Sequence, residues 1–375
     1  MGHPDLKPAR TPDPMTLSNQ TADRDSIGPT PALSTRADEV YGDFISDTRN
    51  YLLHAQWANI SKAGNAAMAK AGFAIEHSKA GVDNARKVIA ENTDLATFLR
   101  VKRSCQEIYK ARIIESYEQR KDEFLRMLDA ADAQGPGSVT YDRDFVYPDY
   151  ATVDIHISPY GYTGHPFAGL IYDYGTSIFY GGANADDALH RRLAAETPAP
   201  KDGRVARLLD IGCSAGQFTC ALKRKFPDAE AIGTDISAPM VRYAHWRAVQ
   251  QTLDVHFAQM PSEALDFPNN HFDLVGCHIL FHEIPVPVIK RTLAEVYRVL
   301  RPGGLFMLWD FATAKPGGTG YGSLVGLMDS ADNGEPYAQG FVHCNVEQLI
   351  ADAGFTLRDN LGAGMLRGRV CDKPD

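Results

Sequence analysis

Residues 208–219 read LLDIGCSAGQFT, and this stretch decides the fold. A short apolar run ends at Asp210, a turn containing Gly212 and Gly216 follows, and an amphipathic segment begins at Phe218. This order is typical of a buried parallel strand that leads through a tight turn into a helix, as in an open α/β sheet. Ligands of such sheets lie at the carboxyl ends of the strands. Glycine lets the backbone approach a ligand where a Cβ would collide.

The residues of the turn distinguish between kinds of nucleotide site. The dinucleotide fingerprint G-x-G-x-x-G needs a middle glycine that G-C-S-A-G lacks, and a phosphate loop needs Gly-Lys-Ser/Thr, which is absent here. The turn instead resembles motif I of the class I S-adenosylmethionine (SAM)-dependent methyltransferases, whose ligand carries no phosphate.

A second segment, residues 233–240 (GTDISAPM), is similar to motif II of the same family. It places Asp235 at the end of the next expected strand, about 20 residues beyond the glycine turn, where a carboxylate binds the ribose diol of a nucleotide. Asp235 would also serve as a helix cap, a role that aspartate fills well. Because the glycine turn stands at the matching distance, we favour ribose binding.

Three further segments continue the resemblance in the family's order. Residues 257–267 (FAQMPSEALDF) resemble the adenine loop, with Pro261 in place of the usual aspartate, so that Ser262 or nearby backbone is expected to meet the ring. Residues 272–285 (FDLVGCHILFHEIP) resemble the fourth strand and the loop after it. Residues 295–310 (EVYRVLRPGGLFMLWD) contain a helix stop followed at once by an apolar strand. The resemblance covers about residues 204–310 and continues more loosely to 371.

The resemblance implies a small-molecule methyltransferase of class I, with a domain like methyltransferase types 11 and 25. Its fold would be α/β: a Rossmann-like, seven-stranded, mostly parallel sheet with an antiparallel last strand. SAM would be the cofactor. The positions that match the family's cofactor site are Asp210, Gly212, Cys213, Ser214, Gly216, Gln217, Asp235, Ile236, Met240, Pro261, Ser262 and His278.

His282 is the candidate general base. Its unperturbed pKa of about 6.5 would leave the imidazole neutral at working pH. Glu283 or another carboxylate is expected to fix its tautomer, and Glu283 is the second catalytic candidate. The alternative, a capping or packing histidine, has about even weight. No metal is expected, because His278 ends a strand and so cannot share a helix face with His282. The residues select no acceptor atom among oxygen, sulfur, nitrogen and carbon.

Composition limits the partners. The chain has 375 residues, a net charge of −9 and 44% hydrophobic residues. An acidic balance argues against duplex nucleic acid as the main partner. No apolar run approaches 18 residues, so no membrane contact is expected. The six cysteines form no C-x-x-C pair, which favours free thiols in a cytoplasmic enzyme of small-molecule metabolism.

The composition changes along the chain and suggests four parts. Residues 1–35 read as a disordered tail and 36–134 as a helical N-terminal domain, whose apolar stripe over 94–131 would be buried in a bundle or a homodimer. Residues 135–182 form a Tyr/Gly-rich lid and connector, and 183–375 the SAM-binding methyltransferase domain. A second insertion, 312–345, is expected over the acceptor.

Tyrosine is concentrated in the connector. Eight of the chain's 16 tyrosines fall within it: Tyr141, Tyr147, Tyr150, Tyr160, Tyr162, Tyr172, Tyr174 and Tyr180. Tyrosine offers an apolar face and a polar tip, which suits a pocket wall. Most are expected to pack the helical region onto the sheet. Tyr172, Tyr174 and Tyr180 are the candidates for substrate contact because they are nearest to the first strand.

Three alternatives stay open. A macromolecule-directed methyltransferase would use the helical domain as a docking surface. A non-catalytic SAM-binding or scaffold protein would keep the glycine turn without turnover. A different reaction aided by SAM, such as decarboxylation or cyclisation, is compatible with the same motifs.

Overall fold

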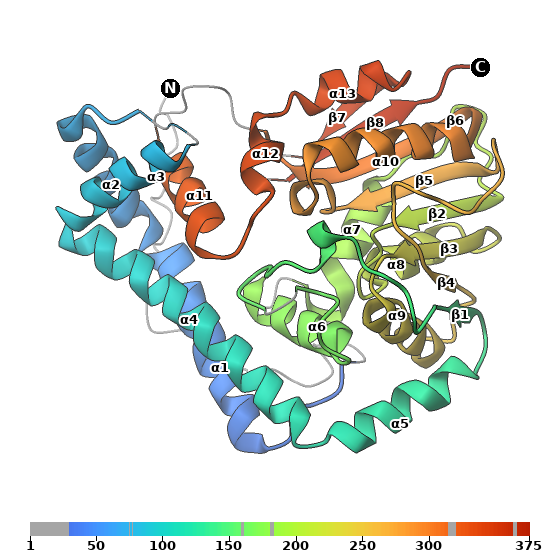
Figure 1. The fold of residues 1–375 in the computed structure, drawn as a ribbon, viewed down its shortest axis with the longest axis horizontal. Helices are drawn as coiled ribbons and strands as arrows, with labels where there is room; N and C mark the ends of the chain where they lie inside the picture. Colours follow the sequence, from blue (N-terminus) through green and yellow to red (C-terminus); the bar gives the residue numbers. More distant parts are fainter. Residues whose placement is uncertain are drawn as a thin grey trace, which may run out of the picture.

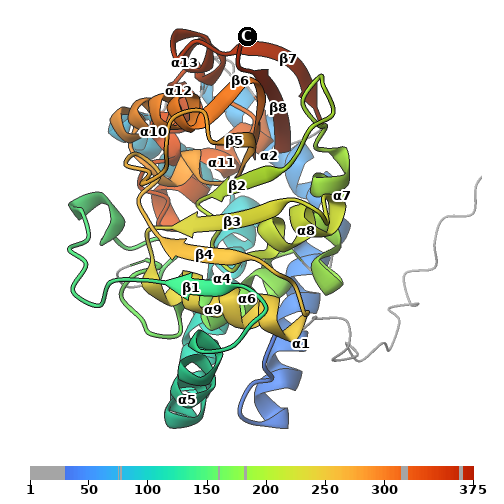
Figure 2. The same ribbon diagram turned by 90° about the vertical axis from the view of Figure 1, so that its right-hand side faces the viewer.

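The computed structural model describes residues 30–74, 76, 78–158, 161–180, 184–313, 320–362 and 366–375. In this part of the chain, eight strands form one sheet with the order β1-β4-β3-β2-β5-β6-β8-β7 (Figures 1 and 2). The strands are β1 Ser138–Thr140, β2 Arg207–Ile211, β3 Glu230–Asp235, β4 His256–Gln259, β5 Phe272–His278, β6 Leu300–Phe311, β7 Thr356–Leu361 and β8 Leu366–Asp372. Only β8 runs antiparallel to its neighbours β6 and β7. The α/β fold expected from the sequence is confirmed, with β1 as an additional edge strand.

Alternation along the strands divides the core into two layers. In β2, Leu208 faces one layer and Leu209 the other, and in β6 Met307 and Leu308 divide in the same way, as the two-residue period of a strand requires. One face is covered by α7 Ala188–Glu196, α8 Gln217–Lys225 and α9 Ala238–Gln250. The other is covered by α10 Val286–Val299 and α13 Val346–Asp352. β5 is buried along its whole length, as befits a central parallel strand.

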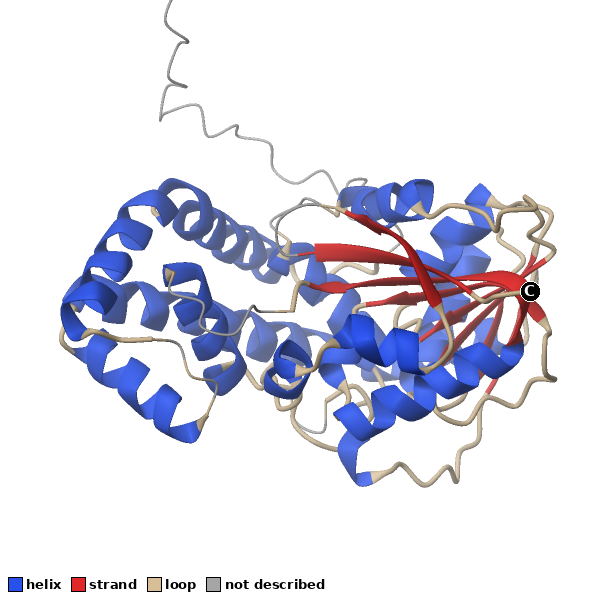
Figure 3. Cartoon of the chain, turned by 90° about the horizontal axis from the view of Figure 1, so that it is seen from above, coloured by secondary structure: helices blue, strands red, loops and turns tan. Residues whose placement is uncertain are grey.

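The N-terminal region is helical (Figure 3). Its elements are α1 Arg36–Asn50, a π-helix at Tyr51–Ala55, α2 Trp57–Ala71, α3 Lys79–Ala90, α4 Thr93–Glu118 and α5 Lys121–Asp132. The apolar stripe predicted over 94–131 is therefore divided between two helices that meet at Arg120, whose φ of −117° is not helical.

The chain before α1 is anchored where the structure describes it. Residues 1–29 of the predicted tail lie outside the described residues. Residues 30–35, which were expected to belong to it, are held in place: Leu33 is buried, and the Thr30 hydroxyl donates to Asp173 over 2.8 Å. The Tyr117 hydroxyl also donates to the carbonyl of Pro31. This correction follows from side-chain partners more than 80 residues away, which local composition does not reveal.

The connector is partly helical. α6 Ala168–Phe179 packs between α4 and α9, and its buried residues join one core with Tyr117, Phe124 and Tyr243. Tyr160 lies outside the described residues. The insertion after β6 forms α11 Tyr321–Asp332 and α12 Ala338–His343, and α11 packs on α2 and α3. The N-terminal helices therefore contact two later parts of the chain: α6, which precedes β2, and α11, which follows β6 (Figure 1). No described helix has the length and apolar character needed to cross a membrane.

Candidate cofactor and acceptor site

The glycine turn lies where the ends of β2 and β3 meet. The two strands are parallel neighbours, and the N–H of Cys213 donates to the carbonyl of Thr234 over 2.8 Å. Gly212 has a φ of +63°, and a Cβ there would lie 2.9 Å from the side chain of Leu280. Only glycine fits this position without strain, because the backbone is left-handed and the space is filled. The turn therefore keeps its backbone open toward the carboxyl end of the sheet.

Asp235 links the two motifs. Its Oδ2 accepts a hydrogen bond from the N–H of Ser214 and its Oδ1 one from the N–H of Ser237, each over 2.9 Å. Burial raises the pKa of the Asp235 carboxyl to about 6. Each oxygen has a second lone pair, so two acceptor positions remain for a pair of hydroxyls. The cap of α9 is the Ser237 side chain, which accepts from the N–H of Met240. Asp235 is therefore not needed as the cap.

A cavity that is open to solvent lies beside this carboxylate. Seven of the residues that the sequence assigned to the cofactor line it: Gly212, Ser214, Asp235, Ile236, Met240, Ser262 and His278. Tyr150, Tyr162, Tyr172 and Glu283 also line it. One continuous space thus joins the cofactor positions to a wall of tyrosines and a carboxylate.

A smaller cavity adjoins the first and accounts for three more predicted residues. Asp210, Cys213 and Gln217 line it together with His190 and His278. Burial raises the pKa of Asp210 to about 7, and its Oδ2 accepts from the Thr219 hydroxyl over 2.6 Å. Its Oδ1 is buried and has no hydrogen-bond partner among the described residues.

Two of the predicted cofactor residues border neither of these described cavities. Pro261 stands between Met260 and Ser262, and both of these residues line the larger cavity. The loop predicted to contact adenine therefore borders this cavity through the two neighbours of Pro261. Gly216 fills a packing role, because a Cβ there would lie 2.8 Å from Ala244 and 2.9 Å from the ring of Phe257.

Sequence reasoning missed a buried ionic network behind the turn. Arg247 has no exposed surface, and its Nη2 lies 2.9 Å from both carboxylate oxygens of Asp187. Its Nε lies 3.2 Å from Asp173. The amide nitrogen of Gln217 donates to both aspartates, over 3.0 and 3.1 Å. The network fixes the first residue of α8, and therefore the turn.

The three tyrosines predicted to contact substrate have different positions. Tyr172 lines both cavities. Tyr174 points into the helical core, where its hydroxyl donates to Glu39 over 2.8 Å. Tyr180 lies beyond the end of α6 with its ring against Phe179, and it is not among the residues that line either cavity. The helical period explains the difference, because residues 172 and 174 lie on different faces of α6.

His282 is buried behind the cavity wall. Its Nδ1 lies 2.7 Å from Oδ1 of Asp310 at the end of β6, and its ring packs on Phe311. Burial disfavours the charged imidazole, but Asp310, Glu283 and Glu335 together outweigh burial and raise the pKa of His282 to about 9. An imidazole that retains its proton at neutral pH is not ready to accept another. The geometry favours Glu283, which borders the cavity, over His282 as the residue nearest to an acceptor.

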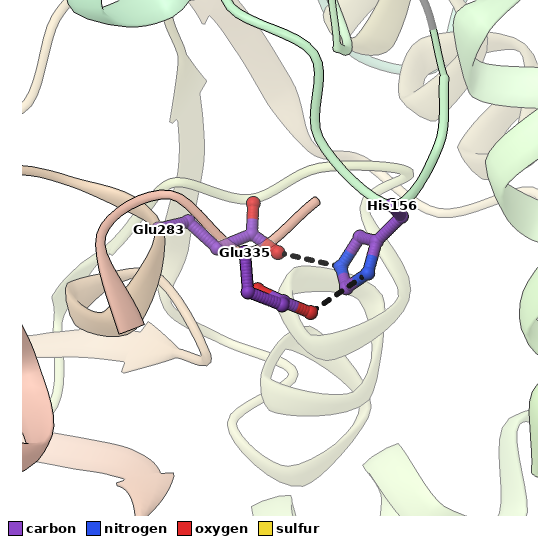
Figure 4. A group of neighbouring side chains, drawn as sticks. All are labelled: His156, Glu283 and Glu335. Atoms are coloured by element: carbon purple, nitrogen blue, oxygen red, sulfur yellow. Dashed lines mark hydrogen bonds and ion pairs between the residues drawn. The ribbon is translucent and has the colours of Figure 1, made fainter. Parts of the chain in front are cut away.

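Glu283 is the centre of a second cluster that the sequence did not reveal (Figure 4). Its Oε1 lies 3.0 Å from Nε2 of His156 and accepts from the Tyr162 hydroxyl over 3.0 Å. The other imidazole nitrogen of His156, Nδ1, lies 2.9 Å from Oε1 of Glu335. These residues come from three loops that lie far apart in the sequence, so spacing gave no signal for them.

The chain is similar in sequence to known methyltransferases. A sequence profile of a family described as "Methyltransferase domain" matches residues 208–304. A demethylmenaquinone methyltransferase of Thermus thermophilus is 32% identical over 204 residues, which are 50% of this chain and 91% of that protein. A ubiquinone/menaquinone biosynthesis C-methyltransferase UbiE of Rhodopseudomonas palustris is 36% identical over 117 residues, 30% of this chain and 46% of that protein.

Among solved structures, a SAM dependent methyltransferase from Aquifex aeolicus has a TM-score of 0.37 and 20% identity, and covers 45% of this chain and 82% of that one. The Thermus relative is matched over 91% of its length, and the residues matched by the family profile include the glycine turn and Asp235. The chain belongs to the class I SAM-dependent methyltransferases; it is an enzyme of that family, and SAM is its cofactor.

Proposed function

We propose that this methyltransferase acts on a small hydroxylated aromatic acceptor and attaches the methyl group to a ring carbon. The observation that carries the proposal is the single cavity that joins Asp235 and Ser214 to Tyr162, Tyr172 and Glu283. The names of two relatives support a quinone-type ring and a carbon acceptor. SAM supplies an electrophilic methyl group, so the acceptor carbon must be electron-rich. A hydroxylated, reduced ring meets that requirement and an oxidised quinone does not.

The residues around the cavity fit SAM. The carboxylate of Asp235 has two free acceptor positions for the ribose diol, as its hydrogen bonds to Ser214 and Ser237 show. The unpaired Oδ1 of Asp210 gives a polar contact beside the smaller cavity. Met240 and Ile236 add apolar surface on the cofactor side. Holding both reactants in line in one cavity is worth roughly 7–11 kcal/mol of the barrier, through orientation.

We propose that Glu283 accepts the proton of the acceptor's hydroxyl group. Transfer of the hydroxyl proton to Glu283 increases the electron density at the ring carbon. The carbon–carbon bond then forms as the carbon–sulfur bond of SAM breaks and releases S-adenosylhomocysteine. The ring proton leaves to solvent, and Glu283 returns its proton to the acceptor oxygen. His282 is proposed as a positioning residue, because its Nε2 lies 3.7 Å from Glu283 while Asp310 holds the other side of its ring. Tyr150, Tyr162 and Tyr172 offer ring faces and hydroxyl groups to the acceptor.

The proposal is tested by incubating the protein with methyl-labelled SAM and a naphthoquinone, with and without a chemical reductant. Labelled product is expected only with the reduced ring, and NMR should place the label on a ring carbon. Label on oxygen or nitrogen, or no transfer to any hydroxylated ring, would reject the carbon acceptor. E283Q should lower turnover by about 10²-fold or more, the usual range for a proton-accepting group, with unchanged SAM affinity.

We also propose that the protein is a homodimer in the cytoplasm. Six of the eight large apolar side chains that are exposed in the described part of the chain lie on α1, the π-helix and α4: Val40, Tyr41, Phe44, Tyr51, Val101 and Ile108. A concentration of exposed apolar side chains on a few neighbouring helices favours an interface. Six free cysteines and an intracellular cofactor support the location. Light scattering should give twice the chain mass, and F44E should halve it; a monomeric wild-type protein would reject the dimer.

A further inference from the structure

Lys110 is a buried lysine of the N-terminal helical region. It stands on α4, and only 7% of the residue is exposed. Its ammonium forms no hydrogen bond or close ion pair with another residue in the described part of the chain. Taking a lysine head group out of water without a hydrogen-bonded partner costs free energy. A buried charge of this kind beside a cavity is a candidate for a functional role.

The packing of α4 on α6 places the Lys110 ammonium next to the cavity wall. A Cβ at Gly175 of α6 would lie 3.8 Å from Nζ of Lys110, so the missing side chain leaves room for the ammonium. Gly175 follows Tyr172 by one helical turn, and both therefore lie on one face of α6. Tyr172 lines both cavities. Lys110 itself lines neither cavity, but its flexible four-carbon stem can turn the ammonium past Gly175 toward a ligand.

Glu283 is the charged residue that acts on Lys110. Burial lowers the pKa of the Lys110 ammonium to about 8, and the negative charge of Glu283 opposes this shift. The ammonium therefore keeps its proton at neutral pH. Glu283 borders the large cavity, so a cation faces the same end of the site as the carboxylate that is proposed to accept a proton.

Glu283 is held in place without Lys110 (Figure 4). Its Oε1 lies 3.0 Å from Nε2 of His156 and accepts from the Tyr162 hydroxyl over 3.0 Å. The other ring nitrogen of His156 lies 2.9 Å from Glu335, and a ring that donates from both nitrogens is an imidazolium. Burial opposes this charge, but Glu335 and Glu283 raise the pKa of His156 to about 10. Because His156 bridges the two glutamates, Lys110 is left to interact with a bound ligand.

We propose that Lys110 is a catalytic residue whose ammonium donates a hydrogen bond to the acceptor oxygen that Glu283 deprotonates. The O–H bond of the acceptor breaks, the proton moves to Glu283, and the negative charge that Glu283 held appears on the acceptor oxygen. Lys110 keeps its three protons and exchanges one anionic neighbour for another. The total charge of the site stays the same, so a neutral hydroxylated ring suits it better than a ring that carries a carboxylate.

This inference rests on the proposed function, because it places the hydroxyl of the acceptor at Glu283. It also gives the N-terminal helical region a part in the reaction, since α4 supplies a group that the sheet and its loops do not. The two claims fail in different ways. The position of the methyl label tests the carbon acceptor, whereas replacement of Lys110 tests the stabilisation of the oxyanion.

The test compares K110M with the wild type in the full chain, using methyl-labelled SAM and the reduced naphthoquinone. K110M should lower kcat by about 10²-fold or more, the usual effect of removing a donor to a developing oxyanion. SAM affinity, measured by calorimetry, should stay unchanged. K110M should also unfold at the same temperature as the wild type or higher, because methionine replaces a buried charge that has no hydrogen-bonded partner. A merely structural lysine would give the opposite result, a less stable variant with normal kcat.

Lys102 gives a matched control on the same helix. It precedes Lys110 on α4, its side chain is 13% exposed, and its ammonium forms an ion pair with Asp329. K102M removes a lysine from α4 but leaves Lys110 in place, so it should keep the turnover of the wild type. Equal kcat in the wild type and a folded K110M overturns the inference, as does an equal loss of turnover in K102M and K110M.

A nitrophenol probe reports the oxyanion directly, because its phenol and phenolate forms absorb at different wavelengths. At a pH below the pKa of the free probe, the probe bound to the wild type should show the phenolate spectrum, and the probe bound to K110M the phenol spectrum. A phenol spectrum in the wild type, or the same phenolate spectrum in both proteins, overturns the role of Lys110. If K110M fails to fold, the spectrum of the wild type decides. Label on oxygen together with slow turnover in K110M would reject the carbon acceptor and support this inference.

Discussion

Replacing Asp235 by asparagine is expected to weaken SAM binding without unfolding the protein. The two carboxylate oxygens accept from Ser214 and Ser237 over 2.9 Å and keep one lone pair each for the ribose hydroxyls. Asparagine retains one acceptor oxygen and loses the charge. One hydrogen bond to a charged group is worth about 1.5–3 kcal/mol, which corresponds to roughly 10- to 150-fold in the dissociation constant.

The assay is calorimetric titration of SAM into wild type, D235N and a surface control, D228N, whose side chain is exposed and which precedes β3, at the opposite end of that strand from Asp235. D228N should bind like the wild type. Thermal unfolding of each variant checks the fold. An unchanged SAM affinity in a folded D235N protein would refute the assignment of the ribose to this carboxylate.

The pH dependence gives a second readout for the same residue. Burial raises the pKa of Asp235 to about 6, and the ribose hydroxyls need the ionised form. SAM affinity should therefore fall as the pH is lowered through about 6. The contribution of Asp235 to the stability of the free protein has the opposite sign: it is present below the unfolded pKa of about 4 and is lost as the pH rises through about 6. Both dependences should be absent from D235N. Asp210, with a pKa of about 7, remains in both proteins, so their difference isolates Asp235.

Three further substitutions test the parts that hold the site. G216A should lower stability more than G203A, because both positions have a left-handed φ, of +75° and +74°, but only Gly216 is crowded; equal unfolding midpoints would contradict this. R247M should destabilise the protein by about 3–5 kcal/mol, since it leaves two buried aspartates without their cation, while R224M at the surface should have little effect in the same urea titration. H282A should both destabilise the protein and lower turnover, whereas H282N, which keeps a donor for Asp310, should keep its melting temperature; a stable, fully active H282A would remove His282 from the site.

The parts of the site that the sequence predicted are local. The glycine turn, Asp235 and the RPGG helix stop each act through neighbours within a few residues, so a short pattern specifies them. The same holds for the central strands, because β5 is buried on both faces and reads as one apolar run. β1 was missed because its three residues gain their order only by pairing with β4.

The parts that the sequence did not predict depend on distant contacts. His156 and Glu335 lie 179 positions apart by their numbering and meet only through the packing of two loops. The left-handed φ occurs at His156, which is not a glycine, so the sequence gives no sign of it. His282 stood at the position where a base is expected, but its partner Asp310 lies at the end of another strand, and that pairing raises the pKa of His282. Tyr174 was misplaced because the helix α6, which turns it toward Glu39, was not foreseen.

A crystal structure of the protein soaked with S-adenosylhomocysteine tests the cofactor site most directly. The nucleoside is expected in the large cavity, with both ribose hydroxyls within hydrogen-bond distance of the Asp235 carboxylate and the sulfur directed toward the end lined by Tyr162 and Glu283. Density for the nucleoside at another place, or an empty cavity at a saturating concentration, would contradict the assignment.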